Sequence, residues 1–348
     1  MSPSRTIRAV APLRISFVGG GTDFPHWFGE HGGAVVSATI DHAVRVAIEP
    51  REDRRVHVRS LDLGHLVAYH LDEGPRYDGV MDLAKAAIER IGVPHGIDVA
   101  IESDAPPGSG LGGSSALVVA MVAGLAALRD LPLTADEVAR IAYAIEREDL
   151  GIAGGWQDQY AAAFGGLNFM EFTRDEVFVT PIACDDETRE RLRERLLLCY
   201  TGAVRRNVGL IDAQIRMHAE GREETLLGMK HLQAMAVSMR DAAVQGRLDD
   251  LGAMLGEAFE NKKRMNPHIA EHTPIEAMLD AARSAGAIGG KICGAGGGGY
   301  VLVYCPPQRR AAVRAELERL GGQIARFAFS TTGVRARDGD RTWAPRVW

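Results

Sequence analysis

The sequence is poor in cysteine and lacks any long apolar run. Its four cysteines show neither CxxC nor CxxH spacing, so the sequence predicts neither a zinc site nor a disulfide framework. The longest apolar stretch, residues 116–128, is too short to span a bilayer, and we expect no membrane partner. No charged segment followed by an apolar one opens the sequence, and we therefore expect a reduced, cytoplasmic protein.

The sequence also lacks a dominant charge of one sign. Its 348 residues carry 46 acidic and 40 basic side chains, a net charge of −6, and only five of the basic residues are lysine. No lysine- or arginine-rich block stands out, which argues against a nucleic-acid partner. The length allows a proper core and two modest domains, and we expect a monomer or a homodimer.

Periodic patterns predict strands and helices that mix without strict βαβ alternation, which is typical of α+β domains. The first strand alternates from Leu13, which places Leu13 toward a core and Arg14 on the other side. Residues 114–128 have no polar face and predict a buried helix. Further strands are expected at 34–40, 43–50, 55–60, 66–71 and 96–104, and further helices at 80–91 and 135–150.

The charged stretch DDETRERLRER, residues 185–195, predicts a solvated helix face and a domain boundary. We therefore expect an N-terminal domain over 1–184 and a C-terminal domain over 185–348. The second domain should contain a strand at 196–200, several helices between about 204 and 285, two strands around 291–305, a helix near 308–320 and a final strand at 325–330.

The stretch PPGSGLGGSSA, residues 106–116, places a glycine loop between a strand and the buried helix. Gly108, Gly110 and Gly113 match the dinucleotide fingerprint, but a helix and no second strand precedes Asp130, which argues against a dehydrogenase. The loop lacks the lysine of a P-loop. The remaining interpretation is a phosphate site made by free N–H groups at a helix start, with a turn and a capping serine as the alternative.

Three separated motifs resemble those of the GHMP small-molecule kinases in the right order. They are APLRISFVGGGTDF at 11–24, PPGSGLGGSSA at 106–116 and KICGAGGGGY at 291–300. The resemblance implies an N-terminal α+β domain like that of a ribosomal protein, a ferredoxin-like C-terminal domain, and a site between them. It also implies phosphoryl transfer from ATP with Mg²⁺. A non-catalytic sugar sensor with the same fold is the alternative.

The resemblance assigns roles to individual residues. Asp158 in GGWQDQ is the candidate base, and Arg14 neutralises charge beside it, with a capping aspartate and an exposed strand arginine as the alternatives. Ser114 and Glu146 are the candidate metal ligands, with Ser115 and Glu148 as substitutes. The expected nucleotide loop consists of Gly108, Ser109, Gly110, Leu111, Gly112, Gly113, Ser114 and Ser115.

The first motif also bears on the acceptor. Galactokinases usually carry Glu-His before the Thr-Asp pair, whereas this sequence has Gly20-Gly21 there. It resembles instead the branch of D-glycero-D-manno-heptose 7-phosphate kinases, which phosphorylate the anomeric hydroxyl of a small-molecule sugar phosphate. The implied substrate-binding residues are Thr22, Asp23, His26, Gly155, Trp156, Arg205, Gly296 and Gly297. A distal phosphate would require cations such as Arg205, Arg206, Lys262, Lys263 or Arg264.

Two departures leave the particular sugar open. Trp156 stands where the heptose kinases are expected to carry a lysine or another polar residue, and Arg206-Asn207 replaces small hydroxyl residues. An octose phosphate, a fucose or a galactose therefore remains an alternative acceptor.

Overall fold

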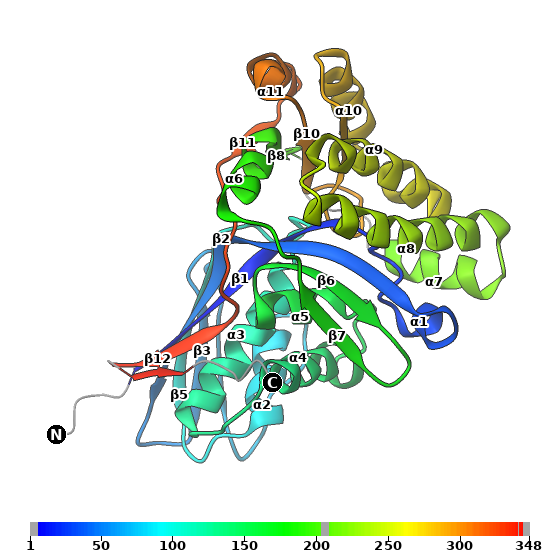
Figure 1. Cartoon of the computed structure of the whole chain (residues 1–348). Helices are drawn as coiled ribbons and strands as arrows, with labels where there is room; N and C mark the ends of the chain where they lie inside the picture. Colours follow the sequence, from blue (N-terminus) through cyan, green and yellow to red (C-terminus); the bar gives the residue numbers. More distant parts are fainter. Residues whose placement is uncertain (1–5, 203–208, 340, 344–348) are drawn as a thin grey trace.

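The structure is a computed structural model that describes residues 6–202, 209–339 and 341–343. Helices and strands are mixed, which confirms the predicted α+β class (Figure 1). The first half contains β1 (Ile7–Val18), α1 (Pro25–His31), β2 (Gly33–Pro50), β3 (Arg55–Ser60), β4 (Leu66–His70), α2 (Asp82–Ile91), β5 (Ile97–Ser103), α3 (Gly113–Leu128), α4 (Ala135–Ala144), a π-helical turn (Ile145–Asp149), α5 (Gln157–Phe164), β6 (Leu167–Phe172) and β7 (Val177–Pro181).

The second half begins with α6, which confirms the helix expected in the charged stretch. No helix among the described residues is long and apolar enough to cross a membrane. The elements are α6 (Asp186–Arg195), β8 (Leu196–Tyr200), α7 (Leu210–Ala219), α8 (Glu223–Val244), α9 (Leu248–Met265), α10 (Ile275–Ser284), β9 (Gly289–Ile292), β10 (Tyr300–Tyr304), α11 (Arg310–Arg319), β11 (Gln323–Ala325), β12 (Arg335–Asp338) and β13 (Arg341–Trp343).

A large sheet with strand order β13-β12-β1-β2-β5-β3-β4 forms the frame of the first half, and β6 and β7 join it through β2. The two strands expected at 34–40 and 43–50 are one continuous strand, β2, because it pairs with β1 along most of its length and with β6 and β5 on its other edge. β2 therefore links all parts of the sheet (Figure 1).

Both faces of β1 are covered, which decides where Arg14 lies. Helix α3, buried along almost its whole length as its sequence predicts, packs with α5 on the core face. Helices α8 and α9 of the second half pack against β1 as well (Figure 1). Arg14, expected on the non-core side, is consequently only 4% exposed. The second half thus closes over the residues that the first strand presents.

A smaller antiparallel sheet with order β11-β8-β10-β9 forms the core of the second half. The strand expected at 325–330 is wrong, because β11 ends at Ala325 and the chain then crosses to the large sheet. There Ser330 N donates to Thr39 O at 2.8 Å, and β12 pairs antiparallel with β1. Residues of the C-terminal segment therefore complete the N-terminal sheet, while the boundary at 184/185 stays a prediction.

Candidate active site

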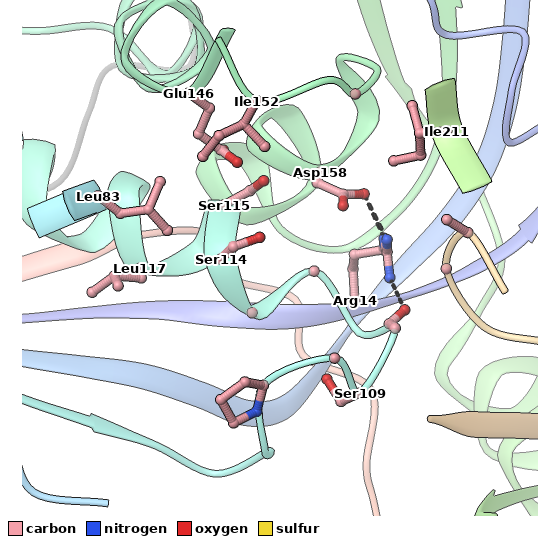
Figure 2. A pocket seen from close by; sticks show the side chains of 18 of the residues that line it. Arg14, Leu83, Ser109, Ser114, Ser115, Leu117, Glu146, Ile152, Asp158 and Ile211 are labelled. Atoms are coloured by element: carbon pink, nitrogen blue, oxygen red, sulfur yellow. Dashed lines mark hydrogen bonds and ion pairs between the residues drawn. The ribbon is translucent and has the colours of Figure 1, made fainter. Parts of the chain in front are cut away.

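A cavity of about 690 Å³ lies where the end of β1, the start of α3, the start of α5 and the second half of the chain meet (Figure 2). Its wall is polar near Arg14 and Asp158. Leu83 and Leu117 lie on the side away from that pair (Figure 2), and Ile101 is a further apolar residue of the lining. A polar end beside an apolar slot suits a ligand that carries both a phosphate chain and a flat base.

The glycine loop reaches the cavity in a conformation that requires glycine. Gly110 has φ +80°, and a Cβ added there would lie 2.6 Å from the carbonyl oxygen of Cys293. Gly112 is left-handed as well, with φ +78°, and it caps the N-terminus of α3. The first turn of α3 thus opens toward the cavity, where its free N–H groups and the helix dipole favour an anion.

Seven of the eight expected loop residues line the cavity, and Leu111 does not. Leu111 is buried, and its carbonyl accepts a hydrogen bond of 2.9 Å from Arg14 N. This residue anchors the loop to β1 and has no side chain facing a ligand. The arrangement supports the phosphate-site interpretation of the loop.

Arg14 and Asp158 meet as the sequence predicts (Figure 2). Arg14 Nε and Nη2 lie 2.8 and 2.7 Å from Asp158 Oδ1, and Nη1 donates to the carbonyl oxygen of Gly110 at 2.6 Å. Within the described part of the chain, Asp158 Oδ2 makes no hydrogen bond. A single buried guanidinium thus links the candidate base to the nucleotide loop and leaves one carboxylate oxygen for a substrate.

The helix expected over 135–150 is confirmed to Asp149, but its last turn differs from the expected α-helix: α4 stops at Ala144 and a π-helical turn follows. Such turns are often found at functional sites because they change the direction in which side chains point. Here the turn contains Glu146, which is only 2% exposed. Gln159 Nε2 donates to Glu146 Oε1 at 2.6 Å and to Ser115 Oγ at 3.1 Å. Burial raises the pKa of Glu146, opposed by the charge of Arg147 and by hydrogen bonds from Ser115 and Gln159.

The structure brings Ser115, rather than the expected Ser114, into a network with Glu146 (Figure 2). Ser114 is exposed and lines the cavity one position earlier. Glu148 faces the surface, where it lies 3.6 Å from Arg90. A buried carboxylate beside a hydroxyl is a donor set that fits Mg²⁺, which prefers oxygen and takes most of its remaining ligands from phosphates and water. Among the described residues no three His, Cys, Asp or Glu side chains are grouped so that they could hold a metal ion, and a Mg²⁺ site completed by phosphates and water does not require three.

Asp23 lines the cavity and is only 1% exposed. It accepts hydrogen bonds from Gly21 N at 2.8 Å and from the backbone N and side-chain Nε2 of Gln157 at 3.1 Å each. Burial raises the pKa of Asp23, and these backbone N–H groups oppose the rise. Gly155 lies beside it on the cavity wall. Asp23 is therefore fixed in orientation and suited to a sugar hydroxyl.

Three other expected acceptor residues do not line the cavity. The hydroxyl of Thr22 bonds the carbonyls of Gly19 and Ala34 at 2.8 and 3.0 Å. The ring of His26 packs 4.7 Å from that of His218, and its pKa falls to about 4 because of burial and that neighbour. The indole of Trp156 stacks on Tyr143 with ring centroids 3.9 Å apart and is not part of the cavity lining.

Some of the remaining expected residues line the cavity and others do not. Gly296 and Gly297 do not line the cavity, although Gly294 and Ala295 of the same motif do, and Gly297 N donates to Ile269 O at 2.8 Å. Arg205 and Arg206 lie outside the described residues. Lys262 lines the cavity, but Lys263 is paired with Glu260 and Glu276, and Arg264 lies 3.8 Å from Glu224.

Sequence reasoning missed three residues of the site. Gln159 joins the carboxylate and the serine, Arg147 lies against Glu146, and Gln157 holds Asp23. Both glutamines stand inside the quoted GGWQDQ segment, on either side of Asp158. That adjacency could have marked them, because residues in the first turn of one helix share the environment of the catalytic group.

Comparisons with known proteins agree with this geometry. Residues 79–166 match the N-terminal domain of the GHMP kinases, and residues 239–323 match their C-terminal domain. The D-glycero-alpha-D-manno-heptose 7-phosphate kinase of Campylobacter jejuni is 34% identical over 95% of this chain and 99% of its own length. A crystal structure described as a D-glycero-D-manno-heptose 1-phosphate kinase from Bacteroides thetaiotaomicron has a TM-score of 0.79 and 31% identity, covering 95% of this chain and 99% of that one.

A Lactococcus lactis galactokinase complexed with galactose has the same TM-score, 0.79, at 20% identity, and it covers 94% of each chain. At that identity the likeness concerns the fold alone. Family membership rests on the two heptose kinase relatives, since the similarity to each extends over nearly the whole of this chain. The chain belongs to the GHMP kinases. It is a sugar kinase of that family, closely similar to the heptose phosphate kinases.

We predict that Gly110→Ala destabilises the protein by about 1–3 kcal/mol, because an alanine at positive φ is strained and its Cβ meets Cys293 O. Gly113→Ala is the matched control, since a Cβ there meets no atom within 4 Å. Thermal unfolding of the ligand-free protein should show a lower Tm for the first variant only. Equal Tm values for both variants would contradict the strained loop.

Proposed function

We propose that the chain transfers the terminal phosphoryl group of ATP to the anomeric hydroxyl of a heptose 7-phosphate or a similar long-chain sugar phosphate. The observation that carries the proposal is the bridge made by Arg14 between Asp158 and Gly110 of the nucleotide loop. It supports a base held beside the place where the phosphates would lie.

The proposed reaction uses the free oxygen of Asp158. As the acceptor oxygen bonds to the terminal phosphorus, its proton passes to Asp158 Oδ2, and the bond between that phosphorus and the bridging oxygen of ADP breaks. A carboxylate is a weak base, so it accepts the proton only as the new bond to phosphorus withdraws electron density from the acceptor oxygen and makes that proton acidic. Arg14 fixes the orientation of the carboxylate, and the N–H groups at the start of α3 hold the phosphate chain.

Ser115 and Glu146 are the residues that would hold Mg²⁺, with Ser114 as the neighbouring hydroxyl. The ion, when bound, neutralises charge on the phosphates. Gln159 keeps the carboxylate and the hydroxyl of Ser115 together through its two hydrogen bonds. The apolar slot formed by Leu83, Ile101 and Leu117 suits the nucleotide base.

The acceptor would lie near Asp23 and Gly155, beside the pair Gly20-Gly21 that lines the cavity without side chains. Small residues there leave room for a sugar longer than a hexose. The two heptose kinase relatives differ in the acceptor that their names specify, one a 7-phosphate and the other a 1-phosphate. The position of the acceptor phosphate is therefore the property to measure.

The test is ADP release with Mg²⁺ and ATP over a panel of D-glycero-D-manno-heptose 7-phosphate, the 1-phosphate, an octose phosphate, fucose and galactose. We expect the highest kcat/KM with the 7-phosphate, and ³¹P NMR should show a second phosphate on carbon 1. Turnover only with another sugar of the panel would contradict the proposed acceptor. No turnover with any of them would favour a sensor over an enzyme.

We predict that Asp158→Asn lowers kcat by about 10²–10⁴-fold, because the amide cannot accept the acceptor's proton. The side chain keeps its size and an oxygen for Arg14, so Tm should change little. Single-turnover kinetics with the preferred sugar measure the effect. Near-normal turnover would remove Asp158 from the mechanism.

We also predict that Ser115→Ala raises the Mg²⁺ concentration needed for half-maximal activity more than Ser114→Ala does. Only Ser115 shares a hydrogen-bonding partner with Glu146. A Mg²⁺ titration at saturating ATP compares the two variants. A larger effect of Ser114→Ala would contradict this prediction and would favour Ser114 and Glu146, the metal ligands expected from the sequence.

A further inference from the structure

Three residues with lysine or arginine side chains line the cavity in the described part of the chain, and their partners differ. Arg14 is paired with Asp158, and Arg147 lies 3.4 Å from Glu146 Oε2. Lys262 makes no ion pair with a carboxylate among the described residues. Among the described residues that line the cavity, Lys262 is therefore the cation without an acidic side chain in contact to balance its charge.

Lys262 lies in the last turn of α9 and is only 7% exposed. Its Nζ donates to the carbonyl oxygen of Gly294, in the third glycine-rich motif. That motif touches the nucleotide loop, since a Cβ added to Gly294 would lie 2.7 Å from Gly110 Cα. Gly110 in turn accepts the hydrogen bond from Arg14 Nη1. Lys262 and Arg14 thus flank the contact between two loops from opposite halves of the chain.

The surroundings of Lys262 favour an anion. Burial, together with the charges of Lys291 and Arg14, lowers the pKa of Lys262 to about 7. Lys291, itself buried, donates to the carbonyl oxygen of Ser16 at 2.6 Å and makes no ion pair with a carboxylate of the described residues. A buried ammonium is costly unless an opposite charge lies close, and one carbonyl dipole does not supply it. A phosphate group bound in the cavity would supply that negative charge.

Arg14 cannot supply this charge alone, because Asp158 already neutralises it. Phosphoryl transfer requires positive charge at the oxygens of the moving group. We propose that Lys262 is a further catalytic residue, which contacts the phosphoryl group that is transferred and balances its charge from the C-terminal half of the chain. The proposal rests on the proposed use of ATP, and it is independent of which sugar is the acceptor.

The test compares Lys262→Met with the matched control Lys263→Met, whose side chain pairs with Glu260 and Glu276 away from the cavity. Calorimetric titration gives Kd for a non-hydrolysable Mg-ATP analogue and for Mg-ADP. We expect Lys262→Met to weaken binding of the analogue by about 10-fold or more, as for a lost charged hydrogen bond, and to leave Mg-ADP unchanged. Lys263→Met should change neither.

These binding measurements require no sugar, so they can be read even if the proposed acceptor is wrong. Equal Kd changes for the analogue and for Mg-ADP, or no change in either, would overturn the proposal. A higher KM for a sugar phosphate, with the parent sugar and the analogue unaffected, would assign Lys262 to the acceptor's phosphate instead and would also overturn it.

A pH series on Lys262→Arg keeps the proposal testable if Lys262→Met does not fold. The groups that act on Lys262 are Lys291, Arg14, Cys293 and Asp23. Because Lys262 loses its proton as pH rises through about 7, the native protein should lose affinity for the analogue between about pH 7 and 9. The arginine variant stays charged, so its affinity should fall less. Parallel curves for the two proteins would contradict the proposal.

Discussion

The hydrogen bonds of Arg14 are the constraint on which the site depends. One guanidinium holds Asp158 through Oδ1 and the nucleotide loop through the carbonyl of Gly110. Arg14 lies in the first strand, whose faces are covered from both halves of the chain. Its side chain is therefore buried, and its hydrogen bonds are stronger than they would be in water. One side chain of the sheet therefore holds the candidate base and the glycine loop together.

The two halves of the chain divide the charges of the cavity between them. The N-terminal half supplies both carboxylate–arginine pairs and the start of α3, the proposed phosphate site. The C-terminal half contributes Lys262 and the glycine-rich loop that touches the nucleotide loop. Close approach of two backbones explains why Gly110 and Gly294 face each other. A substrate phosphate would be held by positive charge from both halves.

Much of this could be predicted from the sequence. The glycine loop and the buried helix after it follow from local sequence patterns, and the pair Arg14–Asp158 follows from the resemblance to the GHMP kinases. The choice between Ser114 and Ser115 could not, because neighbouring helix positions point about 100° apart and the π-helical turn decides where Glu146 faces. Trp156 was beyond prediction for a similar reason, since its stacking partner, Tyr143, belongs to another helix. Such choices depend on packing between elements.

The most direct test of the Arg14 bridge is a double-mutant cycle in single-turnover kinetics with the preferred sugar. It combines Arg14→Met, Asp158→Asn and the double variant. If Arg14 acts through Asp158, the double variant should be slowed little beyond the slower single variant, because both changes remove one unit. Rate losses that multiply would show that the two side chains act independently and would contradict the account.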